Sequence, residues 1–216
     1  MADQPDLVEP SAWLPDDRRR RVILREARAA FMASGFAATR MEPLAREASV
    51  STATLYSYFA SKSVLFEAVI LDVADDFAHR MERVRASSGP ARQRLIEFMT
   101  TYAEFMGDPF VRSVFRLVMA ERPRIRDLAM TFFERGRSGF GRPLMLALSD
   151  LHAAGELVVQ KPSWAAGQLM GMIEHPIFFM PMVTGDEVQA DRSTDQIVAD
   201  CVDTFMARYA GQAAQG

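Results

Sequence analysis

Apolar residues recur along this chain with the spacing of α-helices, and over no useful length do they alternate as in a half-buried strand. Ile23, Ala27 and Phe31 form one face of a first helix. We expect this helix to stop at Gly35, where a left-handed glycine would bring Phe36 into contact with Phe31. The pattern predicts an all-α fold.

Shorter helices with serine or threonine at their starts follow the first one. Thr39 and Glu42 have the spacing of a capping box at the start of a second helix. Ser51 is the expected N-cap of a third helix over residues 52–59, and Ser61 that of a fourth. Two short helices joined by a tight turn are typical of a helix-turn-helix, whose second helix enters the DNA major groove. From spacing alone, an ordinary helical hairpin is an equal alternative.

Clear breakers divide the rest of the chain into longer helices. The expected ranges are 91–106, 109–122, 124–154 with a break between Gly136 and Pro143, a helix from Pro162 interrupted at Pro176 and Pro181, and 193–209. This makes about nine helices in total. We expect a flexible arm over 1–17, a small helix-turn-helix domain over 18–66, and a larger helical domain over 67–216.

Charge is segregated along the chain, although the net charge is only −3. Residues 1–17 hold five acids and no base, whereas residues 18–62 hold nine Lys or Arg and three Glu. A basic segment on an acidic body indicates a partner with negative charge. One cysteine, no secretory h-region and no long apolar run predict a cytoplasmic protein without a membrane span.

The basic segment resembles the DNA-binding domain of the TetR/AcrR family of bacterial transcriptional regulators. The resemblance covers residues 20–70 and is carried by FMASGF, LAREASVS and above all TLYSYFASKSVLF. It implies that the helical domain over 67–216 binds a ligand and forms the dimer. It also implies a homodimer that binds double-stranded DNA at a roughly palindromic operator, most simply a repressor released by a small-molecule effector.

The resemblance also implies which side chains meet DNA. Tyr56 and Lys62 match residues that grip phosphates, whereas small side chains on the third helix are placed to meet base edges. The full set of expected DNA contacts is Arg40, Thr52, Ala53, Thr54, Tyr56, Ser57, Tyr58 and Lys62. One departure is Ser49, which stands where the family usually has Gly; a positive φ there would strain a serine by about 1 kcal/mol.

The C-terminal half is rich in methionine and phenylalanine, which suits an adaptable apolar pocket for a lipophilic or aromatic effector. The candidate pocket residues are Phe105, Phe110, Phe115, Met119, Phe133, Met145, Trp164, Met170, His175 and Phe178. Arg112 and Arg116 lie one turn apart, either on a salt-bridged face or holding an acidic ligand.

Two late helices suit a dimer interface, because glycines flatten one of them and the other has a wide apolar face. The candidate interface residues are Gly167, Gly171, Ile197, Cys201, Val202, Phe205 and Tyr209.

Other classes of function are less well supported. We expect no enzyme and no cofactor, because the chain has no nucleophile–base pair and no phosphate-binding loop. His79, His152 and His175 lack the spacing of metal ligands. Two alternative functions remain. One is a helix-turn-helix that contacts proteins and binds DNA weakly, which Ser49 leaves possible; the other is an activator of the same family.

Overall fold

The computed structural model describes residues 18–121 and 126–211, so the predicted arm over 1–17 lies outside the described residues. Within these ranges every regular element is helical, and a lone β-bridge joins Leu157 to Ala210. The all-α prediction is confirmed. The chain forms two compact units, which divide between Val69 and Ile70.

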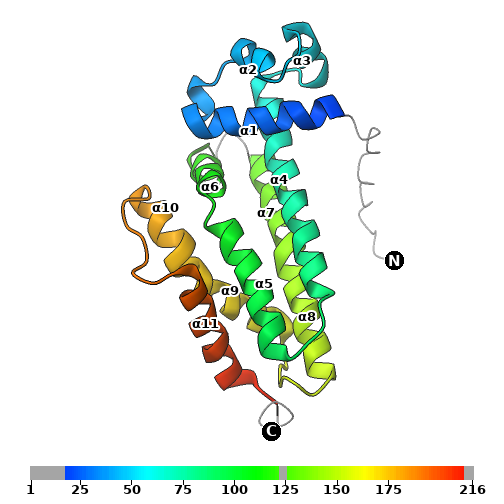
Figure 1. The fold of residues 1–216 in the computed structure, drawn as a ribbon, viewed down its shortest axis with the longest axis vertical. Coiled ribbons are helices and arrows are strands. Elements are labelled where there is room, and N and C mark those ends of the chain that lie inside the picture. The colour runs from blue at the N-terminus through cyan, green and yellow to red at the C-terminus, as the bar shows by residue number, and fades with distance from the viewer. Residues whose placement is uncertain (1–17, 122–125, 212–216) are drawn as a thin grey trace, which may run out of the picture. The chain divides into compact units, whose positions relative to one another are not determined.

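Figure 1 shows the helices, coloured from blue to red in the order of the chain. They are α1 (Arg18–Ala38), α2 (Met41–Glu47), α3 (Thr52–Tyr58), α4 (Lys62–Arg85), α5 (Ala91–Met106), α6 (Pro109–Glu121), α7 (Arg126–Gly136), η1 (Arg137–Gly141), α8 (Arg142–Ala153), α9 (Pro162–Glu174), η2 (His175–Phe179), α10 (Met180–Thr184) and α11 (Thr194–Tyr209).

The N-terminal unit is built around the apolar face of α1. Ile23, Ala27 and Phe31 are buried, and α1 packs against α2, which packs against α3. Gly35 interrupts α1 with φ 73° and ψ 167°, an extended rather than left-handed helical geometry. The ring of Phe36 nevertheless lies 6.0 Å from that of Phe31, so the predicted contact is confirmed, whereas the predicted stop at Gly35 is a kink after which α1 continues to Ala38.

Two of the three predicted caps are present. The Ser51 hydroxyl accepts a hydrogen bond from the Thr54 amide at 3.0 Å, and Ser61 accepts from the Val64 amide at 3.2 Å. The capping box of Thr39 and Glu42 was wrong. The Thr39 side chain is buried and donates to the Gly35 carbonyl at 2.7 Å, so it ties α2 to the end of α1 instead of capping α2.

The C-terminal unit has a core formed by α5, α8, α9 and α11 together with the second half of α4. α11 packs against α5 and α9, and α8 packs against α9 (Figure 1). The side chains buried at its centre include those of Phe98, Tyr102, Leu148, Leu169 and Phe205.

The breaks predicted between Gly136 and Pro143 and at Pro176 are π-helical turns, whereas Pro181 lies inside α10, so the interruption predicted there was wrong. One stretch runs α7–η1–α8 without leaving helical geometry, and the other runs α9–η2–α10. Pro176, inside η2, has no amide hydrogen to donate, and a π-helical turn lets the chain continue past such a gap. Within the ranges described, no helix is both long and apolar enough to span a bilayer.

Candidate functional sites

The outer face of α3 is the first candidate site. Leu55 and the following Phe59 are buried and anchor α3, because they fall one turn apart on its inner face. The opposite face exposes Ala53, Tyr56 and Ser57 to solvent, with the Tyr56 side chain 43% exposed. Thr52, Thr54 and Tyr58 are half-buried at its edges, and Arg40 is exposed at the start of α2. The structure therefore places most of the predicted DNA contacts on an accessible surface.

Hydrogen bonds at α3 distinguish the hydroxyl groups that the helix already engages from the one that is available to a ligand. The Thr54 hydroxyl lies 2.8 Å from that of Ser51, and the Ser57 hydroxyl donates to the Thr54 carbonyl at 2.7 Å. Both hydroxyls are therefore already engaged by the helix itself. Among the described residues no hydrogen bond holds the Tyr56 hydroxyl, which leaves it available to an external acceptor such as a phosphate.

Lys62, an expected phosphate contact, also has a role within the fold. Its ammonium group donates to the carbonyls of Ala37 and Thr39, both at 3.0 Å, and lies 4.7 Å from the centre of the Phe36 ring. Two of its three N–H groups therefore hold the C-terminal end of α1, where a positive charge also complements the helix dipole. We interpret Lys62 chiefly as a residue that positions α1 and α4, and a phosphate contact would use its remaining N–H group.

Ser49 lies in the turn between α2 and α3 with φ 56°, the left-handed region that a β-carbon disfavours. Ser49→Gly is expected to raise the free energy of unfolding by about 0.5–1 kcal/mol, because relief of strain outweighs the greater freedom of glycine in the unfolded chain. Chemical denaturation of both proteins measures the difference. Ser63→Gly, at an exposed position in the first turn of α4, has no such strain to relieve and should not raise the free energy of unfolding. A Ser49→Gly variant less stable than the native chain would contradict this account of the turn.

The C-terminal unit contains an apolar cavity of about 720 Å³. Its walls come from α5, α6, α7, η1, α9 and η2. The lining residues are Tyr102, Met106, Phe115, Val118, Met119, Met130, Phe132, Phe133, Gly136, Phe140, Gly141, Met170, Glu174 and Phe178. Five of the ten predicted pocket residues are among them: Phe115, Met119, Phe133, Met170 and Phe178.

The other five predicted pocket residues lie elsewhere, because composition does not distinguish core from cavity. Phe105 stacks on Phe77 with ring centres 3.9 Å apart, and with Phe110 it lines a separate void of about 20 Å³. Met145 packs against the core of the unit. Trp164 is 67% exposed, and His175 is exposed and stacked on Phe179.

Sequence reasoning missed the polar pair of the cavity, Tyr102 and Glu174. The Tyr102 hydroxyl donates a hydrogen bond to the Glu174 carboxylate. Burial raises the pKa of the Tyr102 phenol far above its ordinary value, and the negative charge of Glu174 raises it further, so the phenol stays protonated. Glu174 lies one turn after Met170 and one turn before Phe178, and this spacing could have placed it on the same wall.

The predicted dimer residues separate into two groups. Ile197, Cys201, Val202 and Phe205 are at most 9% exposed and belong to the core of their own chain, since α11 packs against α5 and α9. Their assignment as contacts between subunits stays a prediction, and their burial within one chain gives it no support. The apolar face of α11 is wide because it meets two helices of the same chain.

Gly167, Gly171 and Tyr209 lie instead along an open groove of about 470 Å³ between α9 and α11. Both glycines have open space where a β-carbon would be, and the Tyr209 hydroxyl donates to the Gln168 side chain at 2.5 Å. This groove is the surface on which a dimer interface of the predicted kind could form.

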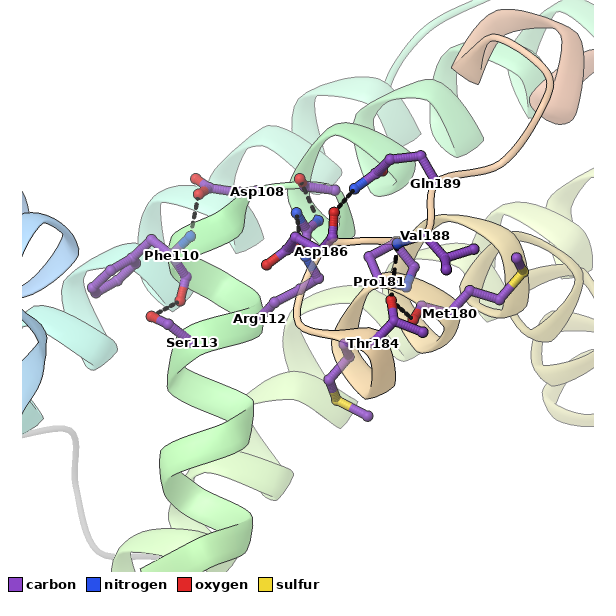
Figure 2. Close-up of polar contacts among 12 residues, drawn as sticks. Asp108, Phe110, Arg112, Ser113, Met180, Pro181, Thr184, Asp186, Val188 and Gln189 are labelled. Atoms are coloured by element: carbon purple, nitrogen blue, oxygen red, sulfur yellow. Dashed lines mark hydrogen bonds and ion pairs between the residues drawn. The ribbon is translucent and has the colours of Figure 1, made fainter.

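An ion-pair cluster joins α6 to the loop after α10 (Figure 2). Arg112 is only 5% exposed and donates to the Asp186 carboxylate at 2.7 Å and to the Gly107 carbonyl at 2.6 Å. Arg116 donates to the same carboxylate and to the carbonyls of Pro181 and Met182. The salt-bridged interpretation of the two arginines is confirmed. The cluster holds two walls of the cavity together, because α6 carries Phe115 and Met119 and α10 continues from η2.

A basic three-helix unit with an exposed α3, joined to a helical unit with an apolar cavity, is the architecture of a helix-turn-helix transcriptional regulator. Comparison with known families agrees in both units. Residues 23–69 match the model of the bacterial regulatory proteins of the tetR family, and residues 93–211 match that of the AefR-like transcriptional repressor C-terminal domain. The chain belongs to the TetR family.

Individual relatives support the same family. A TetR-family transcriptional regulator from Mesorhizobium loti is 25% identical, with a TM-score of 0.77 over 89% of this chain and 97% of that one. The flavonoid-responsive regulator FrrA is 26% identical, with a TM-score of 0.63 over 90% and 98%. The HTH-type transcriptional activator FasR of Mycolicibacterium smegmatis is 31% identical over 93 residues, which are 43% of this chain and 42% of FasR. This chain therefore covers less than half the length of that curated relative.

Proposed function

We propose that this regulator is a homodimeric, ligand-responsive repressor, released from a roughly palindromic operator by a small lipophilic or aromatic effector. The observation that carries the proposal is the presence of an accessible α3 face and an apolar cavity of about 720 Å³ in separate units of one chain. Such a protein needs no catalytic group. It needs two binding sites whose occupancies are coupled.

The DNA contacts divide into two kinds. Arg40 and Tyr56 are exposed and bind phosphates, which fixes the register of the domain on the duplex. Thr52 and Ala53, on the first turn of α3, are short enough to let the helix approach base edges and thymine methyl groups. With no arginine or glutamine on α3, discrimination of single bases is expected near the low end of about 1–3 kcal/mol per contact.

The cavity is the proposed effector site. Its walls are aromatic and thioether side chains, which adapt to flat apolar ligands. That FrrA, a structural neighbour 26% identical to this chain, is described as flavonoid-responsive supports an aromatic effector. An effector that prefers one arrangement of the cavity walls shifts the protein toward the conformation that binds operator weakly, by at most its difference in affinity for the two conformations.

The groove between α9 and α11 is the proposed dimer interface. Gly171→Arg places a long charged side chain in open space, so the subunit should fold normally while close approach of a second helix is blocked. Light scattering after gel filtration should show a dimer for the native chain and a monomer for Gly171→Arg, with a dimer Kd raised by about tenfold or more. Ala86→Arg, an exposed change outside the groove, should stay dimeric. A Gly171→Arg variant that also stays dimeric would place the interface elsewhere.

Activation is the second candidate function, and the similarity to FasR, named as an activator, favours it. The same operator binding produces either outcome, depending on where the operator lies relative to the promoter. A reporter that carries the operator first upstream and then downstream of the promoter start distinguishes the two. Repression from both positions is expected, and increased transcription from the upstream position would establish the activator.

The coupling of the two sites tests the proposed function. Compounds that raise the Tm of the full chain are selected from a panel of lipophilic molecules, and each is titrated against the protein bound to its selected duplex. At least one ligand of the cavity should weaken operator binding, and the operator should weaken binding of that ligand by the same factor. Ligands that occupy the cavity and leave operator affinity unchanged would contradict ligand-responsive release.

A further inference from the structure

The cavity has few polar side chains among its described lining residues, and the one charged group among them, Glu174, is negative. Among the described residues that line it, five are phenylalanines, four are methionines, and the polar side chains are those of Tyr102 and Glu174. None of these lining residues is Lys, Arg or His. His175, the next residue after Glu174, is exposed and stacked on Phe179.

The Tyr102–Glu174 pair can accept hydrogen bonds but has no hydrogen left to donate. Tyr102 is 1% exposed, and its hydroxyl hydrogen is directed to Oε1 of Glu174. No other hydrogen bond to this carboxylate is formed within the described part of the chain, so its second oxygen keeps its acceptor capacity. The polar end of the cavity is therefore a negatively charged acceptor.

A carboxylate beside apolar walls is costly unless a donor or a positive charge accompanies it. An anionic ligand would add a second negative charge at the same place. A cationic ligand would neutralise the carboxylate, and the faces of the surrounding phenylalanine rings would attract it further. Glu174 is also the residue at which α9 passes into the π-helical turn η2, a kind of turn frequent at functional sites.

We propose that the effector is a lipophilic aromatic cation, whose amine is held by Glu174, and that aromatic and lipid-like carboxylates are excluded. This inference rests on the proposed function of the cavity as the effector site, and it adds the charge of the ligand. Tyr102 is the positioning residue: its hydrogen bond fixes Glu174 at the cavity wall.

Three probes with the same three-ring system and different polar ends test the inference: 9-(aminomethyl)anthracene, 9-anthracenemethanol and 9-anthracenecarboxylate. Their affinities for the full chain are measured by fluorescence anisotropy at pH 7. The ammonium probe should bind about tenfold or more tightly than the alcohol, and the carboxylate more weakly than the alcohol.

Matched variants test whether the preference for the ammonium probe depends on Glu174. In Glu174→Gln, which keeps an acceptor for Tyr102, the ammonium and alcohol probes should bind within about twofold of each other. In Glu104→Gln, an exposed carboxylate on α5 outside the cavity, the tenfold preference should persist. Met170→Trp, which fills the cavity, should weaken all three probes, and unchanged circular dichroism spectra show that the variants fold.

The outcomes distinguish a failure of the cationic-effector inference from a failure of the cavity as the effector site. Binding of the carboxylate probe as tightly as the ammonium probe, or a preference for the ammonium that survives in Glu174→Gln, overturns the cationic effector and leaves the cavity as an effector site. Failure of all three probes to bind overturns both, because an aromatic cavity of this volume would then not accept aromatic ligands.

Discussion

Replacement of Arg40 by alanine together with Tyr56 by phenylalanine is expected to weaken binding to the selected operator about 100-fold. Hydrogen bonds to charged groups contribute about 1.5–3 kcal/mol each, and about 1.4 kcal/mol corresponds to a tenfold change in Kd. Both side chains are exposed, so their loss should leave the fold intact. The measurement is fluorescence anisotropy with a labelled duplex at several salt concentrations.

The salt dependence separates a lost phosphate contact from a damaged domain. Removal of the Arg40 guanidinium should reduce the slope of log K against log salt by about 1, because one fewer counterion is released. Arg83→Ala, which removes an exposed arginine from the part of α4 in the other unit, should bind operator as the native chain does. Native affinity in the double variant would contradict the placement of DNA on the α3 face.

Arg112→Ala is expected to lower the free energy of unfolding by about 2–3 kcal/mol. Loss of one partner from a buried ion pair costs about 3–5 kcal/mol. The effect should be smaller here because the Asp186 side chain is 33% exposed and keeps Arg116 as a partner. The variant also leaves the Gly107 carbonyl without its guanidinium donor. Urea denaturation followed by circular dichroism measures the change, which should appear in the C-terminal unit.

The matched control is Arg92→Ala. Arg92 pairs with Asp203 at 2.7 Å, but both side chains are at least half exposed, so its loss should lower the free energy of unfolding much less than the loss of Arg112 does. Equal losses for the two variants would show that the Arg112 cluster contributes no more than an ordinary surface pair.

The contribution of Arg112 to the free energy of unfolding should decrease as the pH falls. Burial raises the pKa of the Asp186 carboxyl, but the hydrogen bonds and charges of Arg116 and Arg112 outweigh it, and the net shift is downward. A carboxyl with a lowered pKa in the folded state stabilises the fold above its unfolded pKa of about 3.9 and loses that contribution as pH falls through the folded value. The difference between native and Arg112→Ala should therefore shrink below about pH 4.

Local patterns predicted most of the fold, because the signals for helices lie within a few residues. Ser51 and Ser61 cap the helices that follow them, and the proline at position 176 coincides with a π-helical turn. The failure at Thr39 has a tertiary cause: its hydroxyl binds the Gly35 carbonyl, a partner that the spacing to Glu42 does not reveal.

The sites were less predictable than the helices, because the role of each site residue depends on contacts between segments that are distant in the sequence. The α11 face containing Val202 is apolar whether it packs within one subunit or between two, so composition alone assigned it to the dimer. Lys62 was matched to a phosphate contact, and only the folded chain shows its ammonium on the carbonyls of Ala37 and Thr39. Tyr102 and Glu174 are 72 residues apart, and their pairing follows from the packing of α5 against α9.

Selection from a pool of random double-stranded DNA at moderate salt tests the central claim most directly, with the native chain and the Arg40→Ala/Tyr56→Phe variant in parallel. The native protein should enrich a roughly palindromic site, whose two halves lie one helical turn or more apart, and the variant should not. Equal retention of unenriched DNA by both proteins would contradict the account. It would mean that the basic segment attracts DNA without reading it, and that the helix-turn-helix serves protein contacts instead.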